Sequence, residues 1–285
     1  MWLNLVLLLV LVLLFIPISI VLYGITRWQA GTTVLRARLE GARGRIIPNI
    51  YESTELDTLP DPVQRYFRAV LREGQPMIAA AELRQEGEFD LGRETSRWAP
   101  VVATQSVVTQ PPGFHWDARI RFTLAAKLFV QDAYIVGTGV LKASLLGLFD
   151  VVKVPSSMEL THAELMRFLA EAPLYPTALL PSQGVHWEPI DDTSARASLA
   201  DGDLSVSLVF LFDETGLIHR VQSTGRYRAV DGAMVQTPWE AVFSNYKERG
   251  GMRIPVQGEV AWSLPEARAP YWRGCITDVL YKFSA

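Results

Sequence analysis

The sequence predicts an α+β protein in which an N-terminal transmembrane helix precedes one large curved antiparallel β-sheet, or open half-barrel, covered by two or three helices. The first 26 residues carry no charged side chain. From Ile78 onward, short segments rich in β-branched and aromatic residues alternate with turn residues. Parallel strands would need crossover connections of about a dozen residues or more, so these closely spaced strands are expected to form an antiparallel meander.

The uncharged stretch over residues 1–26 is almost continuously aliphatic. About 20 such residues in a helix cross the hydrocarbon core of a bilayer. Trp2 at one end, and Tyr23 with Trp28 at the other, stand where amphipathic rings lie at membrane interfaces. A cleaved secretory signal is the alternative, but it would begin with basic residues that this stretch does not have. We therefore expect an uncleaved single-pass anchor.

A basic segment follows over residues 27–58, and apolar residues at helical spacing predict a short helix over 28–39. Its five arginines are Arg27, Arg36, Arg38, Arg43 and Arg45. They can contact anionic lipid headgroups or lie on a solvated linker face. The positive-inside rule predicts a protein of the inner membrane with its globular part in the cytoplasm, and the periplasm is the alternative. The residues expected at the membrane interface are Trp2, Tyr23, Trp28, Arg27, Arg36 and Arg38.

The rest of the chain, residues 59–285, is predicted to form one β-rich globular domain. From Ile46 onward the chain has 22 Lys and Arg against 29 Asp and Glu, and such an acidic domain is not expected to bind nucleic acid. The single cysteine, Cys275, excludes an intrachain disulfide and a cysteine-rich zinc site. The four histidines do not pair at metal-ligand spacing, so neither a metal nor a cofactor is expected.

Two helices are expected in this domain. Apolar residues at i, i+3, i+4, i+7 and i+8 predict one over 63–71. Thr161, with Glu164 three residues later, has the pattern of a capping box and predicts the other over 161–171, with helical cover of the sheet continuing to Leu180. The period of two predicts strands at 80–89, 99–109, 113–122, 127–138, 141–154, 185–189, 195–199, 204–212, 217–227, 240–246, 258–263 and 271–281.

Aromatic and charged side chains indicate a ligand site. Over residues 113–122 apolar and polar residues alternate, so the apolar face either packs as core or lines a cavity for an apolar ligand. Glu164, Arg167 and Glu171 share one face of the second helix. That face either borders a cavity, where it holds a polar headgroup or acts on a substrate, or faces water. The candidate ligand-binding residues are Trp98, Phe114, Trp116, Tyr134, Glu164, Arg167, Glu171 and Trp187.

Several motifs occur in order along the domain: LPDPVQRYF at 59–67, PPGF at 111–114 followed by Trp116, and EAPLYPTALLP at 171–181. The set resembles an uncharacterised bacterial family of membrane-anchored proteins, classified only as a domain of unknown function, over nearly all of 59–283. The resemblance implies no activity and no catalytic residue. The expected shape is also similar to the half-barrels of periplasmic lipoprotein carriers, at the level of fold alone.

These observations predict a single-span, membrane-anchored, non-enzymatic protein whose curved β domain binds an apolar or lipid-like ligand at the membrane surface. Its expected partners are the lipid bilayer and that ligand, and not a nucleic acid. Two alternatives remain open. One is an accessory or structural subunit of a larger membrane protein complex. The other is a hydrolase or isomerase that uses Glu164, Glu171 or Asp191 in a cavity.

Overall fold

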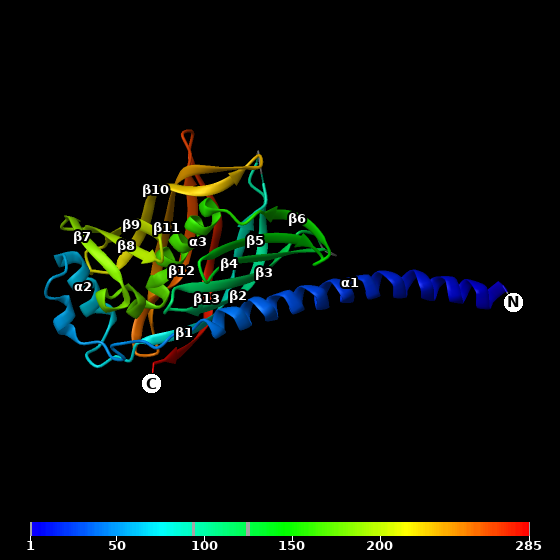
Figure 1. The fold of residues 1–285 in the computed structure, drawn as a ribbon. Helices are drawn as coiled ribbons and strands as arrows, with labels where there is room; N and C mark the ends of the chain where they lie inside the picture. The colour runs from blue at the N-terminus through cyan, green and yellow to red at the C-terminus, as the bar shows by residue number, and fades with distance from the viewer. Residues whose placement is uncertain (1, 93–94, 124–125, 285) are drawn as a thin grey trace.

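The computed structural model describes residues 2–92, 95–123 and 126–284, without the side chains of 3, 7–12 and 14. Within these residues all thirteen strands join one antiparallel sheet in the order β6-β5-β4-β3-β2-β1-β13-β12-β11-β10-β9-β8-β7 (Figure 1). The strands are β1 Ile78–Asp90, β2 Trp98–Val108, β3 Gly113–Arg121, β4 Lys127–Ile135, β5 Thr138–Leu145, β6 Phe149–Val154, β7 Val185–Asp191, β8 Ser194–Asp201, β9 Leu204–Phe212, β10 Ile218–Val230, β11 Ala233–Arg249, β12 Met252–Ser263 and β13 Arg268–Phe283. The predicted curved antiparallel sheet is therefore confirmed.

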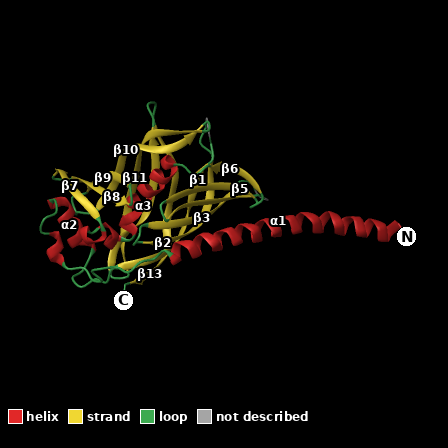
Figure 2. Ribbon diagram, viewed as in Figure 1, coloured by secondary structure: helices red, strands yellow, loops and turns green. Residues whose placement is uncertain are grey.

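Helices pack against this sheet, and the N-terminal part of the longest one extends beyond it (Figure 2). They are α1 Trp2–Gly41, α2 Asp61–Val70 and α3 Met158–Glu171, with short 3₁₀ turns at Ser53–Leu56, Ala172–Leu174, Pro176–Leu179 and Pro181–Gln183. α3 connects the two edge strands, β6 and β7, and contacts strands from both halves of the sheet. It therefore crosses the concave face and closes it.

The start of α3 differs from the prediction. The helix begins three residues earlier, because the Ser157 side chain accepts a hydrogen bond from the Leu160 amide at 3.2 Å. The Thr161 hydroxyl instead donates to the Ser157 carbonyl at 2.8 Å and accepts from the Gly139 amide at 3.2 Å. The predicted capping box is therefore wrong, and Glu164 is left free to point into the concave face.

Two other predicted boundaries change. The expected strand over 141–154 is two strands, β5 and β6, because Leu146 and Gly147 turn the chain with φ values of 56° and 73°. The expected helical cover up to Leu180 is a series of 3₁₀ turns, since Pro173, Pro176 and Pro181 interrupt α-helical hydrogen bonding.

The main core lies between the concave face and helices α2 and α3. The predicted alternation along β3 holds: Phe114, Trp116, Ala118 and Ile120 are buried on the concave side. The other face of β3 lies under α1, where His115 is fully buried. A second, smaller cluster on this convex side packs α1 against the sheet through Leu39, Ala80, Val108, Ala133 and Ile135.

α1 is one continuous helix that includes the predicted segment 28–39 and runs through Pro17. Its first close approach to the domain is at Gly24, where a Cβ would lie 2.2 Å from the Leu146 carbonyl oxygen, so the contact requires glycine. Before this point the helix projects away from the sheet (Figure 1). Among the described residues, no helix combines the length and the hydrophobicity that crossing a membrane requires.

The residues expected at a membrane interface fall into two groups. Trp28 is only 4% exposed, donates from Nε1 to Asp117 Oδ1 at 2.8 Å and packs edge-on against Phe129. Arg36 donates to Thr104 Oγ1 at 2.7 Å. These two side chains dock α1 on the sheet. The exposed members of the set are Trp2, Tyr23, Arg27 and Arg38.

Candidate functional site

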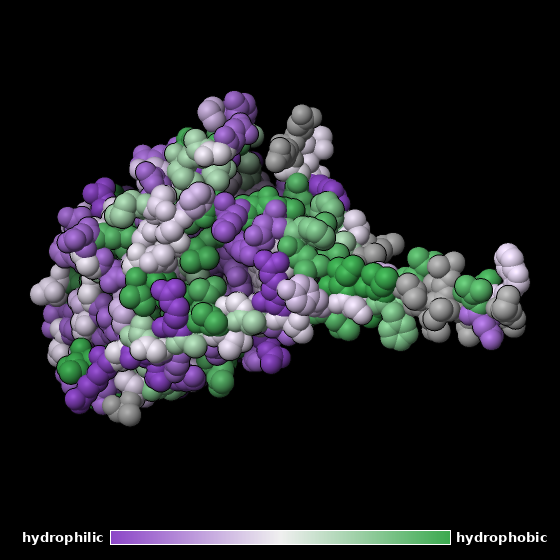
Figure 3. Space-filling view, turned by 45° about the vertical axis from the view of Figure 1, so that its right-hand side comes forward, coloured by the Kyte–Doolittle hydropathy of each residue, from purple (hydrophilic) through white to green (hydrophobic). Residues whose placement is uncertain are grey.

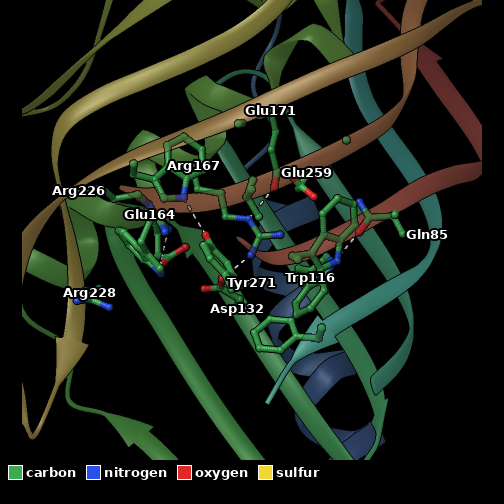
Figure 4. A pocket seen from close by; sticks show the side chains of 18 of the residues that line it. Gln85, Trp116, Asp132, Glu164, Arg167, Glu171, Arg226, Arg228, Glu259 and Tyr271 are labelled. Atoms are coloured by element: carbon green, nitrogen blue, oxygen red, sulfur yellow. Dashed lines mark hydrogen bonds and ion pairs between the residues drawn. The ribbon is translucent and has the colours of Figure 1, made fainter. Parts of the chain in front are cut away.

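The concave face holds a cavity of about 500 Å³, bounded by α3 on one side and by strands from both halves of the sheet on the other (Figure 4). This volume is within the range of small-molecule sites, roughly 300–1,000 Å³. Most of its wall is apolar. Residues that line it include Val130, Leu141, Val152, Leu160, Leu174, Met234, Trp239, Val260, Trp262, Tyr271, Trp272 and Ile276.

One face of α3 supplies the polar part of the wall. Glu164, Arg167 and Glu171 all line the cavity, and Glu164 is 3% exposed. The alternative of a solvated helix face is therefore wrong. Spacings of three and four residues place these side chains in one row along the helix, because one turn contains 3.6 residues.

Arg167 is held between two carboxylates. Its Nε donates to Glu171 Oε1 at 2.7 Å, and its Nη1 forms an ion pair with Asp132 on β4. The guanidinium also lies over the rings of Phe114 and Trp116, at 4.9 and 5.1 Å. Burial alone would lower the pKa of Arg167, but the surrounding carboxylates raise it. Arg167 therefore carries a fixed positive charge.

A chain of hydrogen bonds continues from Glu171 along the wall. Gln105 Nε2 donates to Glu171 Oε2 at 2.6 Å, and Gln85 Nε2 donates to Gln105 Oε1 at 3.0 Å. Trp116 Nε1 donates to Gln85 Oε1 at 2.8 Å. An indole nitrogen can only donate, so the Gln85 amide must turn its oxygen toward Trp116 and its NH₂ toward Gln105. Gln105 in turn accepts with its oxygen and directs its own NH₂ at Glu171. The polar wall is thus preorganised.

Glu164 lies beside this network without a full set of partners. Its Oε2 and Asp132 Oδ1 are both buried and have no hydrogen-bond partner among the described residues. Burial raises the pKa of Glu164 well above its usual value, the Asp132 charge adds to this, and Arg226 acts in the opposite direction. This shift favours the neutral acid form of Glu164, whose O–H Asp132 can accept.

Two arginines of β10 complete the charged lining. Arg226 Nε donates to the Ala163 carbonyl at 3.3 Å, and its guanidinium lies over the rings of Trp239 and Trp262, at 5.4 and 5.7 Å. Arg228 Nε donates to Thr237 Oγ1 at 3.0 Å, and its guanidinium lies 5.4 Å from the centre of the Trp262 ring.

The structure brings together four of the eight predicted ligand residues: Trp116, Glu164, Arg167 and Glu171. The other four lie outside the cavity wall. Phe114 is fully buried core beneath Arg167, and Trp98 stacks with Arg273 at 4.3 Å. Tyr134 donates to Asp201 Oδ2 at 2.7 Å, and Trp187 donates to the Leu179 carbonyl at 2.9 Å within the core.

The sequence analysis missed Asp132, Arg226, Arg228 and Tyr271. A detectable signal was present for the arginines, because two charges at i and i+2 on a strand must share one face of the sheet. Asp191 does not reach the cavity: it is exposed at the end of β7 and accepts a hydrogen bond from the Thr193 amide at 2.8 Å. In the described part of the chain, no three His, Cys, Asp or Glu side chains are grouped as metal ligands.

A family model described as "Family of unknown function (DUF6920)" matches residues 57–281, in agreement with the resemblance to an uncharacterised family. No curated protein matches the chain. One similar solved structure is a β-barrel-like protein of the domain of unknown function DUF1849 from Brucella abortus, with 11% identity over 72% of this chain and 99% of that chain, and a TM-score of 0.26. Another is a LolA superfamily protein from Nitrosomonas europaea, with 10% identity over 87% of this chain and 93% of that chain, and a TM-score of 0.27. TM-scores of this size support no conclusion about function.

Proposed function

We propose that this chain, which belongs to the DUF6920 family of unknown function, is a binding protein that holds an apolar or lipid-like ligand in the cavity of its curved sheet. The observation that carries the proposal is a cavity of about 500 Å³ whose wall is mostly apolar and whose polar groups gather on α3 and β10. A wall of this kind suits an amphipathic molecule, with a hydrocarbon part against the aliphatic and tryptophan side chains and a polar end near the arginines.

The hydrophobic effect contributes a large part of the free energy of such binding, but not enough of it on its own. Each methylene group removed from water contributes about 0.8 kcal/mol. A ten-carbon chain would therefore contribute about 8 kcal/mol, against a cost of about 4–15 kcal/mol for lost translational and rotational freedom and further costs for ordering. A ligand of that size binds measurably only if its polar end also finds partners, and the charged wall provides them.

The proposal extends to a membrane-attached protein with its β domain at the membrane surface. The projecting part of α1 carries green, hydrophobic side chains in Figure 3, and those described as exposed include Leu5, Leu13, Phe15, Ile16, Ile18 and Leu22. Exposure of such a helix to water is costly, whereas a bilayer solvates it. The exposed Arg27 and Arg38 follow this segment, which favours a single-pass inner-membrane protein with the domain in the cytoplasm.

The test is native mass spectrometry of the full chain extracted from its own membrane in a mild detergent. Val152 lines the cavity and is 43% exposed, so Val152→Trp narrows the entrance. Val151 precedes Val152 in β6, is 54% exposed and does not line the cavity, so Val151→Trp is the matched control. We expect a bound lipid on the wild type and on V151W, and its loss from V152W.

Two results would overturn the proposal. One is an empty cavity in wild-type protein extracted from its own membrane. The other is equal ligand content in V152W and V151W. A stoichiometric protein partner together with an empty cavity would favour the accessory subunit instead. For the hydrolase or isomerase, Glu171 is engaged by Arg167 and Gln105, and Asp191 is exposed at the end of β7. That alternative therefore rests on Glu164, which lines the cavity with an unpartnered Oε2.

A further inference from the structure

The charged residues that line the cavity do not balance. The arginines are Arg167, Arg226 and Arg228, and the acidic residues are Asp132, Glu164, Glu171 and Glu259. Glu259 is engaged by Arg268, which does not line the cavity, at 2.5 Å. Asp132 and Glu171 both bind Arg167, and burial favours the neutral form of Glu164. With Glu164 in this form, the rest of the wall has one positive charge in excess, and this excess lies at β10.

Arg226 and Arg228 have donors to spare. Among the described residues, the closest carboxylate to Arg226 is that of Glu164, with Nη2 3.7 Å from Oε1, and none lies within 4.0 Å of Arg228. Within the part of the chain that the structure describes, each uses only Nε in a hydrogen bond, to Ala163 and Thr237 respectively. The terminal N–H groups of both side chains therefore remain for another acceptor.

The aromatic residues around these arginines restrict their motion. The Arg226 guanidinium lies over Trp239 and Trp262, and Arg228 lies over Trp262. Trp239 is itself fixed, because its Nε1 donates to the Tyr271 hydroxyl at 2.9 Å. Planar guanidinium groups held in this way lose little entropy when they bind an oxyanion, and their forked donors match carboxylate and phosphate oxygens.

We propose that Arg226 and Arg228 bind the anionic group, a carboxylate or a phosphate monoester, of an amphipathic ligand whose hydrocarbon part lies along the apolar wall. This inference rests on the proposed function of the cavity and specifies the chemical class of its ligand. An anion with one negative charge neutralises the excess at β10 and gives each arginine the partner that it lacks. A neutral lipid of the same chain length would leave both charges desolvated and unpaired.

The experiment compares three twelve-carbon probes, namely laurate, dodecyl phosphate and dodecanol, by titration of delipidated full chain in a nonionic detergent. Tryptophan fluorescence reports binding, because Trp239 and Trp262 contact the arginines. Charge-assisted hydrogen bonds contribute about 1.5–3 kcal/mol each, so the anionic probes should bind about 10–100-fold more tightly than dodecanol. A preference between laurate and dodecyl phosphate then distinguishes a fatty-acid carboxylate from a phosphate as the natural group.

Variants assign the preference to these side chains. Arg228→Gln removes a half-buried charge that donates a hydrogen bond to Thr237 and is the milder change, while Arg226→Gln removes a buried charge. Arg220→Gln is the control, because Arg220 is on the same strand, binds Glu240 and does not line the cavity. R228Q and R226Q should each reduce the preference for the anionic probes over dodecanol about tenfold, and R220Q should match the wild type.

The outcomes separate the two proposals. If no probe binds the wild type, the proposed function fails. If dodecanol binds as tightly as the anionic probes, or if R228Q and R226Q retain the full preference for them, the cavity binds an apolar ligand and the anionic assignment is overturned.

Discussion

The buried side chain of His115 should make the stability of the protein depend on pH. Its side chain is 0% exposed beneath α1, and neither ring nitrogen has a hydrogen-bond partner among the described residues. Burial lowers the pKa of His115 from 6.5 to about 4, although the nearby Asp117 charge acts in the opposite direction. The folded protein therefore holds a neutral imidazole at pH values where the unfolded chain takes up a proton.

The sign and size follow from proton linkage. Since the pKa is lower in the folded state, the contribution of His115 is fully present above pH 6.5 and is lost as pH falls from 6.5 towards about 4. At 1.36 kcal/mol per pKa unit, a fall from about pH 7.5 to about pH 5 should lower the free energy of unfolding by about 2 kcal/mol from this residue alone.

The assay is urea unfolding of the full chain in a nonionic detergent at both pH values, followed by tryptophan fluorescence. His115→Met is the comparison, since methionine is flexible, does not titrate and sacrifices no hydrogen bond at this site. When the pH is lowered from about 7.5 to about 5, the free energy of unfolding should fall by about 2 kcal/mol more for the wild type than for H115M. Equal losses in the two proteins would refute the reasoning, whatever the absolute stability of the variant.

Four further changes test other parts of the structure. Gly139→Ala should destabilise the domain by about 1–3 kcal/mol in a thermal melt, because a Cβ there would lie 2.9 Å from the α3 backbone at Leu160 and Thr161. Gly31 on α1 has open space around it, so Gly31→Ala should be neutral or stabilise the helix by about 0.5–1 kcal/mol. A similar loss of stability in G139A and G31A would contradict the packing argument. Trp28→Ala should speed amide hydrogen exchange in residues 28–41 and leave the sheet protected, because α1 loses its buried ring and its hydrogen bond to Asp117. Unchanged exchange would show that Trp28 does not dock α1. Glu164→Gln should lower the free energy of unfolding by less than about 1 kcal/mol at pH 7, because burial raises the pKa of Glu164 and favours a neutral side chain; a loss of about 3 kcal/mol or more in chemical denaturation would mean that Glu164 is ionised.

The sheet could be predicted from the sequence because strands and tight turns are each recognised from a few neighbouring residues. A period of two marks each strand, and turns as short as that at Asp201 and Gly202 permit only antiparallel neighbours. The predicted boundaries were wrong where a neighbouring residue capped the helix or turned the chain instead of the expected one. Ser157 caps α3 in place of Thr161, and a turn at Leu146 divides what reads as one apolar strand.

The site could be predicted only in part, because its groups are distant in sequence. Glu164, Arg167 and Glu171 could be grouped from helical spacing alone. Their partners Asp132 and Arg226 come from β4 and β10, and only the curvature of the sheet brings these strands to opposite sides of α3. Aromatic residues gave no such information, since a tryptophan in a core and one in a cavity wall have the same local pattern.

The pairing of β1 with β13 gives the domain a late step in its synthesis. β1 finds its neighbour β2 at once, but its other edge pairs only with β13, and all eleven remaining strands are made between them. At about 5–20 residues per second, the ribosome needs on the order of ten to forty seconds to make that stretch. During this interval β1 presents an unpaired row of amide and carbonyl groups, which is a template for pairing with another nascent chain. Completion of β13 closes that edge, so we expect truncation before Arg268 to give an aggregating product rather than a smaller soluble domain.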